Sequence, residues 1–305
     1  MSKTKVRDIA ASVRQRLLNK ARQTNRPFSE LAQYFAMERF LYRLSKSSYA
    51  DKFILKGALM LPVWKAPLAR PTMDIDMLGQ IDNSIEVIVD VIRSICTQHV
   101  KPDGITFDTN TIMGERITED ADYEGVRIKF RGTLGTVRIS MQVDIGFGDV
   151  VVPPATPIAY PTILDLPKPH LLGYSMESTI AEKFEAMVKL GILNSRMKDF
   201  FDIWFLARHF NFSGHTLKKA VKATFSTRST NIPSFPVAFT PDFSKDPIKD
   251  AQWKAFIRKN RLLNIPKEFQ KIVTDIAAFL GSLVENLARN RSFKSSWKAP
   301  GPWRQ

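Results

Sequence analysis

The chain has 305 residues, of which 44% are hydrophobic and 25% charged, the balance of a globular protein long enough for a well-buried core. One cysteine excludes an internal disulfide framework and a thiolate metal cage. No apolar run approaches the ~20 residues that span a bilayer, and the charged N-terminus lacks a secretory apolar core, so we expect a cytoplasmic protein without membrane association. The net charge of +15 favours a polyanionic partner, although charge that serves solubility alone is the alternative.

The first 100 residues alternate between helical and extended patterns. Apolar spacing predicts helices over residues 5–20 and 28–45. The apolar stretch 53–63 follows, either as a short helix after Gly57 or as part of a sheet. Residues 73–79 are predicted as an acidic strand, and Asn83-Ser84 is expected to cap the next helix.

The acidic strand carries the first candidate site, Asp74 and Asp76. Alternate residues of a strand point to the same face, so the two carboxylates would lie together. At a separation of about 4 Å they would repel by ~4 kcal/mol at an effective dielectric near 20. A divalent cation such as Mg²⁺ would relieve that repulsion, whereas a solvated edge strand would avoid it. The preceding Lys56-Gly57-Ala58 offers a turn where backbone amides could approach a phosphate.

A β-rich block follows, with a hairpin turn predicted at Gly132–Gly135. On the returning strand Asp144 lies opposite the inward-facing apolar residues. It could therefore reach Asp74 and Asp76 if the two strands are neighbours, or simply end its strand. On the outgoing strand, Arg127, Lys129 and Arg131 share a face that is either a track for RNA or a solvated surface.

A proline-rich connection over residues 152–169 is the best boundary between domains, which we place at 1–160 and 161–305. The second domain is predicted to be helical, with Ser175 as the first helix cap. The basic residues 291–305 are expected to form a loosely ordered tail. The predicted helices cover residues 176–192, 198–210, 215–225, 249–262 and 266–290.

Two of these helices carry charged candidates. Lys183 lies at the edge of an apolar helix face, where it either contacts a phosphate or extends past the core into solvent. Asp199 and Asp202 share one side of the next helix, and either act in a site or complement the helix dipole.

The series Gly57-Ala58, Asp74-Ile75-Asp76, residues 177–187 and Lys198-Asp199-x-x-Asp202 resembles the motifs of the AbiEii/AbiGii-type abortive-infection nucleotidyltransferases. These proteins are toxins of bacterial toxin–antitoxin systems. The resemblance covers about residues 50–210. It implies an α+β fold in which a polymerase-β-type nucleotidyltransferase domain with a mixed β-sheet precedes a C-terminal helical domain.

The resemblance further implies an enzyme that uses Mg²⁺ and transfers a nucleoside monophosphate from a nucleoside triphosphate to RNA. Better-studied relatives modify the acceptor end of tRNA, and a cognate antitoxin encoded nearby is the expected protein partner. Asp74 and Asp76 match the metal ligands and Lys183 the triphosphate contact. Asp144 is added as a third ligand from strand phase. The expected catalytic residues are Asp74, Asp76, Asp144, Asp199 and Asp202, and the expected phosphate-binding residues are Lys56, Gly57, Ala58, Arg70 and Lys183.

Ala58 departs from the family pattern, because many relatives have serine or glycine there and alanine offers no hydroxyl to a phosphate. Two alternative functions therefore stay open. One is a non-catalytic module that binds nucleic acid or an antitoxin. The other is a phosphotransferase that acts on a protein or a small molecule.

Overall fold

The computed structural model describes residues 8–66, 70–117 and 125–305, which form two compact units. Unit 1 contains the chain up to residue 148 together with 156–173, and unit 2 contains 149–155 and 174–305. The predicted boundary at 160/161 falls inside unit 1, because residues 156–173 return there and add two strands to its sheet.

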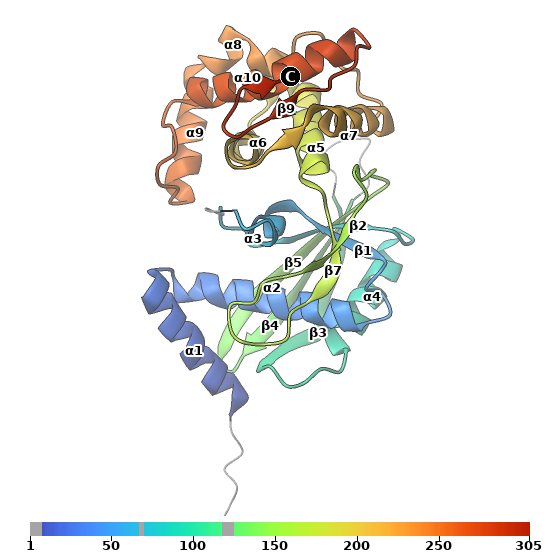
Figure 1. Ribbon diagram of the computed structural model, residues 1–305. Helices are drawn as coiled ribbons and strands as arrows, with labels where there is room; N and C mark the ends of the chain where they lie inside the picture. The colour runs from blue at the N-terminus through green and yellow to red at the C-terminus, as the bar shows by residue number, and fades with distance from the viewer. Residues whose placement is uncertain (1–7, 67–69, 118–124) are drawn as a thin grey trace, which may run out of the picture. The chain divides into compact units, whose positions relative to one another are not determined.

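Unit 1 is built on a seven-stranded mixed sheet with the strand order β3-β4-β5-β2-β1-β7-β6 (Figure 1). Strand β2 runs parallel to β5 and antiparallel to β1, so it lies near the centre of the sheet. The strands are β1 (Phe53–Lys56), β2 (Ile75–Gly79), β3 (Ile105–Ile117), β4 (Gly125–Leu134), β5 (Val137–Phe147), β6 (Thr156–Ala159) and β7 (His170–Gly173).

The helices of unit 1 follow from clear end signals. Helix α1 (Ile9–Thr24) starts where the Asp8 side chain accepts a hydrogen bond from the Ala11 amide, and it ends at Asn25 in the left-handed conformation. It therefore runs beyond the predicted end at residue 20, while residues 5–7 of that prediction lie outside the described residues. The other helices are α2 (Phe28–Lys46), α3 (Met60–Val63) and α4 (Ile85–Thr97), with a 3₁₀ turn at Gly57–Leu59.

The stretch 53–63 combines both predicted alternatives, since β1 enters the sheet and α3 follows directly. The hairpin between β4 and β5 differs from its prediction. The strands stay paired as far as Leu134 and Val137, so the turn consists of residues 135–136, with φ +59° at Gly135, and residues 132–134 belong to β4.

The two faces of the sheet have different environments. The rings of Phe40 on α2, Phe107 on β3 and Phe130 on β4 meet with centroids 5.6–6.0 Å apart. Alternation of side chains along β4 and β5 buries this face under α2 and α4, as the apolar pattern predicts. The polar residues of β4 and β5 therefore point to the opposite, open face.

Unit 2 is mainly helical, and Ser175 caps its first helix as predicted by accepting from the Ser178 amide. The elements agree with the five predicted helices to within a few residues at each end, and the short α8 has no counterpart among the predictions. They are α5 (Met176–Leu190), α6 (Met197–His209), α7 (Gly214–Thr227), α8 (Pro241–Ser244), α9 (Pro247–Lys259) and α10 (Phe269–Ala288), with 3₁₀ turns at Gly191–Leu193 and Val237–Phe239.

The prediction of a loosely ordered C-terminal tail is wrong. Strands β9 (Ser296–Trp297) and β10 (Trp303–Arg304) join β8 (Phe212–Ser213) in a three-stranded sheet. The indole of Trp297 is 3% exposed and donates to the Ala207 carbonyl at 2.6 Å. The Trp303 ring stacks on Phe279. Burial of the Trp297 ring and packing of the half-buried Trp303 ring outweigh the basic, proline-containing composition on which the prediction rested.

In the described part of the chain, no helix is both long enough and apolar enough to cross a membrane.

Candidate active site

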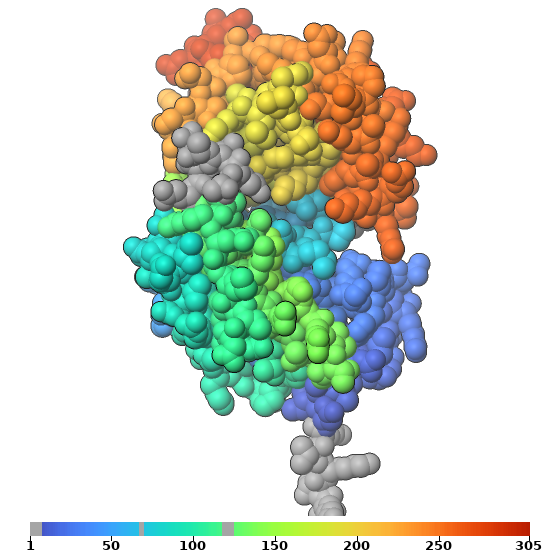
Figure 2. Space-filling view, turned by 180° about the vertical axis from the view of Figure 1, so that it is seen from behind, coloured from blue at the N-terminus to red at the C-terminus, as the bar shows by residue number. Residues whose placement is uncertain are grey.

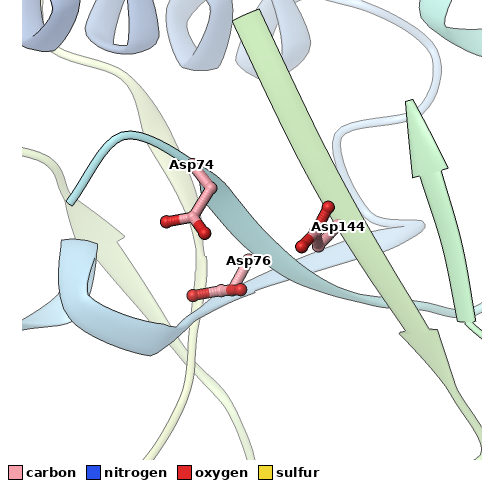
Figure 3. A group of neighbouring side chains, drawn as sticks. All are labelled: Asp74, Asp76 and Asp144. Carbon is pink, nitrogen blue, oxygen red and sulfur yellow. The ribbon is translucent and has the colours of Figure 1, made fainter. Parts of the chain in front are cut away.

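Three carboxylates meet on the open face of the unit 1 sheet (Figure 3). Asp76 on β2 lies directly opposite Asp144 on β5, because the two strands are parallel neighbours. Asp74 comes immediately before β2 on the same side. One oxygen from each carboxylate lies within 4.8 Å of the others, and all three residues are half-buried. The strand phase that suggested Asp144 thus brings it to the predicted pair.

Gly57 explains how Asp76 fits against the neighbouring strand. A Cβ atom on Gly57 would lie 1.9 Å from Asp76 Oδ2, which no side chain can tolerate. The residue also has φ +70°, in the region that favours glycine. Lys56 pairs with Asp76 across β1 and β2, so its side chain projects on the same face as the carboxylate. Ala58, which follows, is buried.

Asp74 is held by a residue that the sequence analysis did not select. The Thr72 hydroxyl donates a hydrogen bond to Asp74 Oδ1. The Thr72 amide in turn donates to the Tyr34 hydroxyl at 3.0 Å, and the Gln33 amide donates to the Met73 carbonyl at 3.2 Å. Helix α2 therefore anchors the segment that enters β2. The available signal was the Thr-x-Asp spacing, which is typical of local side-chain hydrogen bonding.

Asp144 is held by Arg127, the residue opposite it on β4. The guanidinium donates from Nε to Oδ1 at 2.9 Å and from Nη2 to Oδ2 at 2.7 Å, a bidentate pair that fixes the carboxylate plane. Gln142 also donates to Oδ2 at 3.2 Å. With a turn at 132–135, each residue of β4 would lie opposite a residue four positions earlier on β5 than it does in the structure. The predicted register therefore concealed the pair of Arg127 and Asp144.

The donor set fits a hard divalent cation. Three carboxylate oxygens are the ligand type that Mg²⁺ and Mn²⁺ prefer, and a site of this kind needs cationic charge to offset three negative ones. Arg127 supplies one positive charge at its edge. The chain can thus hold a metal at this point with side chains whose orientation is already fixed by Thr72 and Arg127.

Arg70 lies at the start of the segment that leads to Thr72 and is half-buried. Burial raises the pKa of the Tyr34 hydroxyl, and the positive charge of Arg70 is one of those that oppose this rise. Arg70 therefore belongs to the surroundings of the hydroxyl that fixes Thr72.

A second group of predicted residues comes together within unit 2. Lys183 on α5 places its Nζ 2.8 Å from Asp199 Oδ1 and 2.9 Å from Asp202 Oδ2, both on α6. Arg196 Nε lies 2.7 Å from the other Asp199 oxygen. Burial by itself would raise the pKa of Asp199, but the charges of Lys183 and Arg196 outweigh it and hold that pKa below its usual range.

This arrangement favours a particular division of roles. Asp199 and Asp202 are almost completely buried, so their carboxylates are poorly placed to meet a substrate. The Lys183 side chain keeps 14% of its surface exposed. The two aspartates are therefore better suited to orient the ammonium group of Lys183 than to act directly.

Comparison with known proteins agrees with this architecture. Residues 39–275 match the family model described as nucleotidyl transferase AbiEii toxin, Type IV TA system. The fold is similar to the crystal structure of JHP933 from Helicobacter pylori, with a TM-score of 0.51 and 17% identity over 86% of this chain and 95% of that chain. A second structure, of a "putative nucleotidyltransferase from H. pylori", gives a TM-score of 0.46 and 16% identity over 85% and 95% of the two chains. No curated protein matches the chain.

Proposed function

The chain belongs to the AbiEii nucleotidyltransferase toxin family, and from that premise we propose that it transfers a nucleoside monophosphate from a nucleoside triphosphate to the 3′ end of an RNA, with the acceptor end of tRNA as the expected target. As a member of a type IV toxin–antitoxin family it has a nucleotide substrate and an antitoxin partner. The reaction is expected in the cytoplasm, where its RNA substrate is found.

The observation that carries the proposal is the cluster of Asp74, Asp76 and Asp144 on adjacent strands of a nucleotidyltransferase-type sheet. These residues would hold Mg²⁺, which when bound activates the attacking hydroxyl and offsets the charge of the triphosphate. In the proposed reaction the oxygen of the RNA 3′-hydroxyl attacks the α-phosphorus, the hydroxyl proton passes to solvent, and a phosphodiester bond forms. The bond between the α- and β-phosphates breaks, and pyrophosphate leaves with the electron pair.

The surrounding residues prepare the carboxylates for this reaction. Thr72 and Arg127 fix the Asp74 and Asp144 carboxylates before substrate arrives, which removes the cost of orienting them in the transition state. Both Asp144 oxygens accept from Arg127, so we assign Asp144 to holding the metal and orienting the attacking hydroxyl.

The phosphate-binding side is assigned to β1 and the turn that follows it. Lys56 shares the face of Asp76, and the Gly57-Ala58 backbone runs beside that carboxylate. These groups suit the triphosphate because a lysine acts as a point charge and backbone amides donate without a hydroxyl. Ala58 then lacks one side-chain donor but leaves the backbone donors in place. We assign Lys183, oriented by Asp199 and Asp202, to the triphosphate as well.

The test is transfer of label from a nucleoside triphosphate carrying ³²P at the α-phosphate to total RNA in the presence of Mg²⁺. We expect labelled RNA, and a rate at least about 100-fold lower when Asp74 and Asp76 are both changed to Ala, because several kcal/mol of charge stabilisation would be lost. Binding of Mn²⁺, followed by electron paramagnetic resonance, should disappear in the same variant. Asp90→Ala, on the exposed side of α4, serves as the matched control that keeps both properties.

Each other outcome contradicts part of the proposal. If the label appears on protein or on a small molecule and not on RNA, the acceptor is not RNA. In a parallel reaction with label at the γ-phosphate, transfer of that label with no transfer of the α-label would make the enzyme a phosphotransferase. Equal labelling of RNA by wild type and by the double variant would show that Asp74 and Asp76 are not required for the reaction.

A further inference from the structure

The open face of the sheet continues beyond the three carboxylates along β4 and β5. Lys129, Arg131 and Arg138 project from this face and are exposed. We name these three residues the basic sheet face. The strand pairing shows which face they are on, because Arg127 shares their side of β4 and lies opposite Asp144. The alternate residues of β4, Val126, Ile128 and Phe130, are buried on the other side. In the view from behind, the green atoms, which include β4 and β5, lie at the surface (Figure 2).

The basic sheet face leads away from the carboxylates in regular steps. Lys129 lies opposite Gln142 and Arg131 opposite Ser140, one and two same-face positions from the Arg127–Asp144 pair. Same-face residues of a strand are about 7 Å apart, so Arg138 lies about 20 Å along β5 from Asp144. The exposed Ser140 and the half-buried Gln142 and Thr133 offer hydrogen-bonding side chains between the charges.

The charge of Lys129 can be transferred to an incoming anion. Lys129 contacts Glu115 at 2.7 Å, but both side chains are 53% exposed, and a surface pair of this type contributes only about 0–1 kcal/mol. A phosphate could therefore replace Glu115 at little cost. Arg127 differs, because its fork on Asp144 is more shielded from solvent, and it is excluded from the basic sheet face for that reason.

The order of strands separates the two substrates. The carboxylates lie at the β5–β2 junction, with β1 and Gly57 on one side and β4 and β3 on the other. If the nucleoside triphosphate occupies the β1 side, the acceptor must reach the carboxylates from the β4 side. That side carries the basic sheet face.

Building on the proposed function, we propose that the basic sheet face binds the phosphates of the single-stranded nucleotides that precede the acceptor 3′-hydroxyl of the RNA. A single strand fits because the terminal hydroxyl must reach carboxylates on the same face. Cationic side chains at regular intervals follow a phosphate backbone without reading its sequence.

The test compares two variants that each lose three positive charges. The first changes Lys129, Arg131 and Arg138 to Gln. The control changes Lys222, Lys245 and Lys267 to Gln, which are exposed residues of unit 2. Both are examined in the full chain for binding of a fluorescein-labelled single-stranded RNA of about ten nucleotides, without nucleoside triphosphate, over a range of KCl concentrations.

We expect the first variant to bind this RNA about tenfold more weakly than wild type. The slope of log Kd against log salt concentration should be smaller than that of wild type by about 2, the value expected for the loss of three phosphate contacts on a single strand. The control should keep the wild-type slope. Binding of a fluorescent ATP analogue and the thermal unfolding temperature should be unchanged in both variants, which separates the effect from misfolding.

Equal RNA affinity and slope in the two variants would overturn the proposal while leaving the proposed function intact, provided that wild type still labels RNA. Loss of antitoxin binding with unchanged RNA binding would also overturn it, because the face would then be a protein interface. Failure of wild type to label any RNA would instead contradict the proposed function, whichever variant binds the oligonucleotide.

Discussion

At the scale of single residues, the candidate site depends on three side chains that hold others in place. Thr72 fixes Asp74, Arg127 fixes Asp144, and the absence of a side chain at Gly57 makes room for Asp76. None of these three residues needs to touch a substrate for its effect. Each acts by fixing a carboxylate whose position decides whether a cation can bind.

Gly57→Ala provides the sharpest test of this view. Its Cβ would overlap Asp76 Oδ2, so we expect loss of Mn²⁺ binding and a rate of nucleotide transfer lower by about 100-fold or more. Gly148→Ala is the matched control, because φ is +79° there but no atom lies within 4 Å of the added Cβ. It should cost about 1 kcal/mol of unfolding free energy and leave metal binding unchanged. Equal metal affinity in both variants would contradict the packing of Gly57 against Asp76.

At the scale of secondary structure elements, α5 and α6 are joined by a buried charge cluster as well as by apolar contacts. Lys183 on one helix contacts Asp199 and Asp202 on the other, and Arg196 completes the pairing of Asp199. Removal of one partner from a buried pair leaves the remaining charge uncompensated, which is more destabilising than the net value of the pair.

Asp199→Asn should therefore lower the free energy of unfolding by about 3 kcal/mol near pH 7. The folded-state pKa of Asp199 lies below that of the unfolded chain, so its stabilisation is present above the unfolded pKa and is lost as the pH falls through the folded pKa. The difference between wild type and variant should consequently shrink below about pH 4, as measured by urea unfolding at a series of pH values.

Asp242→Asn, an exposed aspartate of the same unit, is the control and should have little effect at any pH. A destabilisation by Asp199→Asn that stays constant from about pH 7 to about pH 3 would show that the carboxylate charge is not what joins α5 and α6.

At the scale of the whole molecule, the chain crosses between its two units more than once. Residues 149–155 belong to unit 2, yet 156–173 return to complete the sheet of unit 1. Strand β7 pairs with β1, the strand that ends at Lys56 directly before Gly57, so the sheet that carries the three carboxylates depends on a segment beyond the predicted domain boundary.

A fragment of residues 1–160 should therefore be less stable than a fragment of residues 1–173, although both contain all three carboxylates. The shorter one lacks β7 and leaves β1 as an unpaired edge. We expect a lower midpoint or no cooperative transition when its circular dichroism is followed on heating. Identical melting of the two fragments would show that β7 is dispensable for the sheet.

The sequence by itself determined most of the element order and the chemistry of the site. Apolar spacing predicted the long helices, strand alternation placed Asp144 on the polar face, and the motif series indicated the family that the family model confirms. These features succeeded because they depend on local periodicity, which survives in any packing arrangement. Asp74 and Asp76 are separated by one residue in the sequence and could be recognised as a pair.

Tertiary structure decided which residues surround those carboxylates. The pairing of Arg127 with Asp144 depends on a hairpin register set by a turn two residues later than predicted, and the contact of Gly57 with Asp76 depends on strand order. The C-terminal residues 291–305 became ordered because Trp297 is buried against α6 and the Trp303 ring stacks on Phe279 of α10. Register, strand order and long-range burial are properties of contacts far apart in the chain, so no local pattern could supply them.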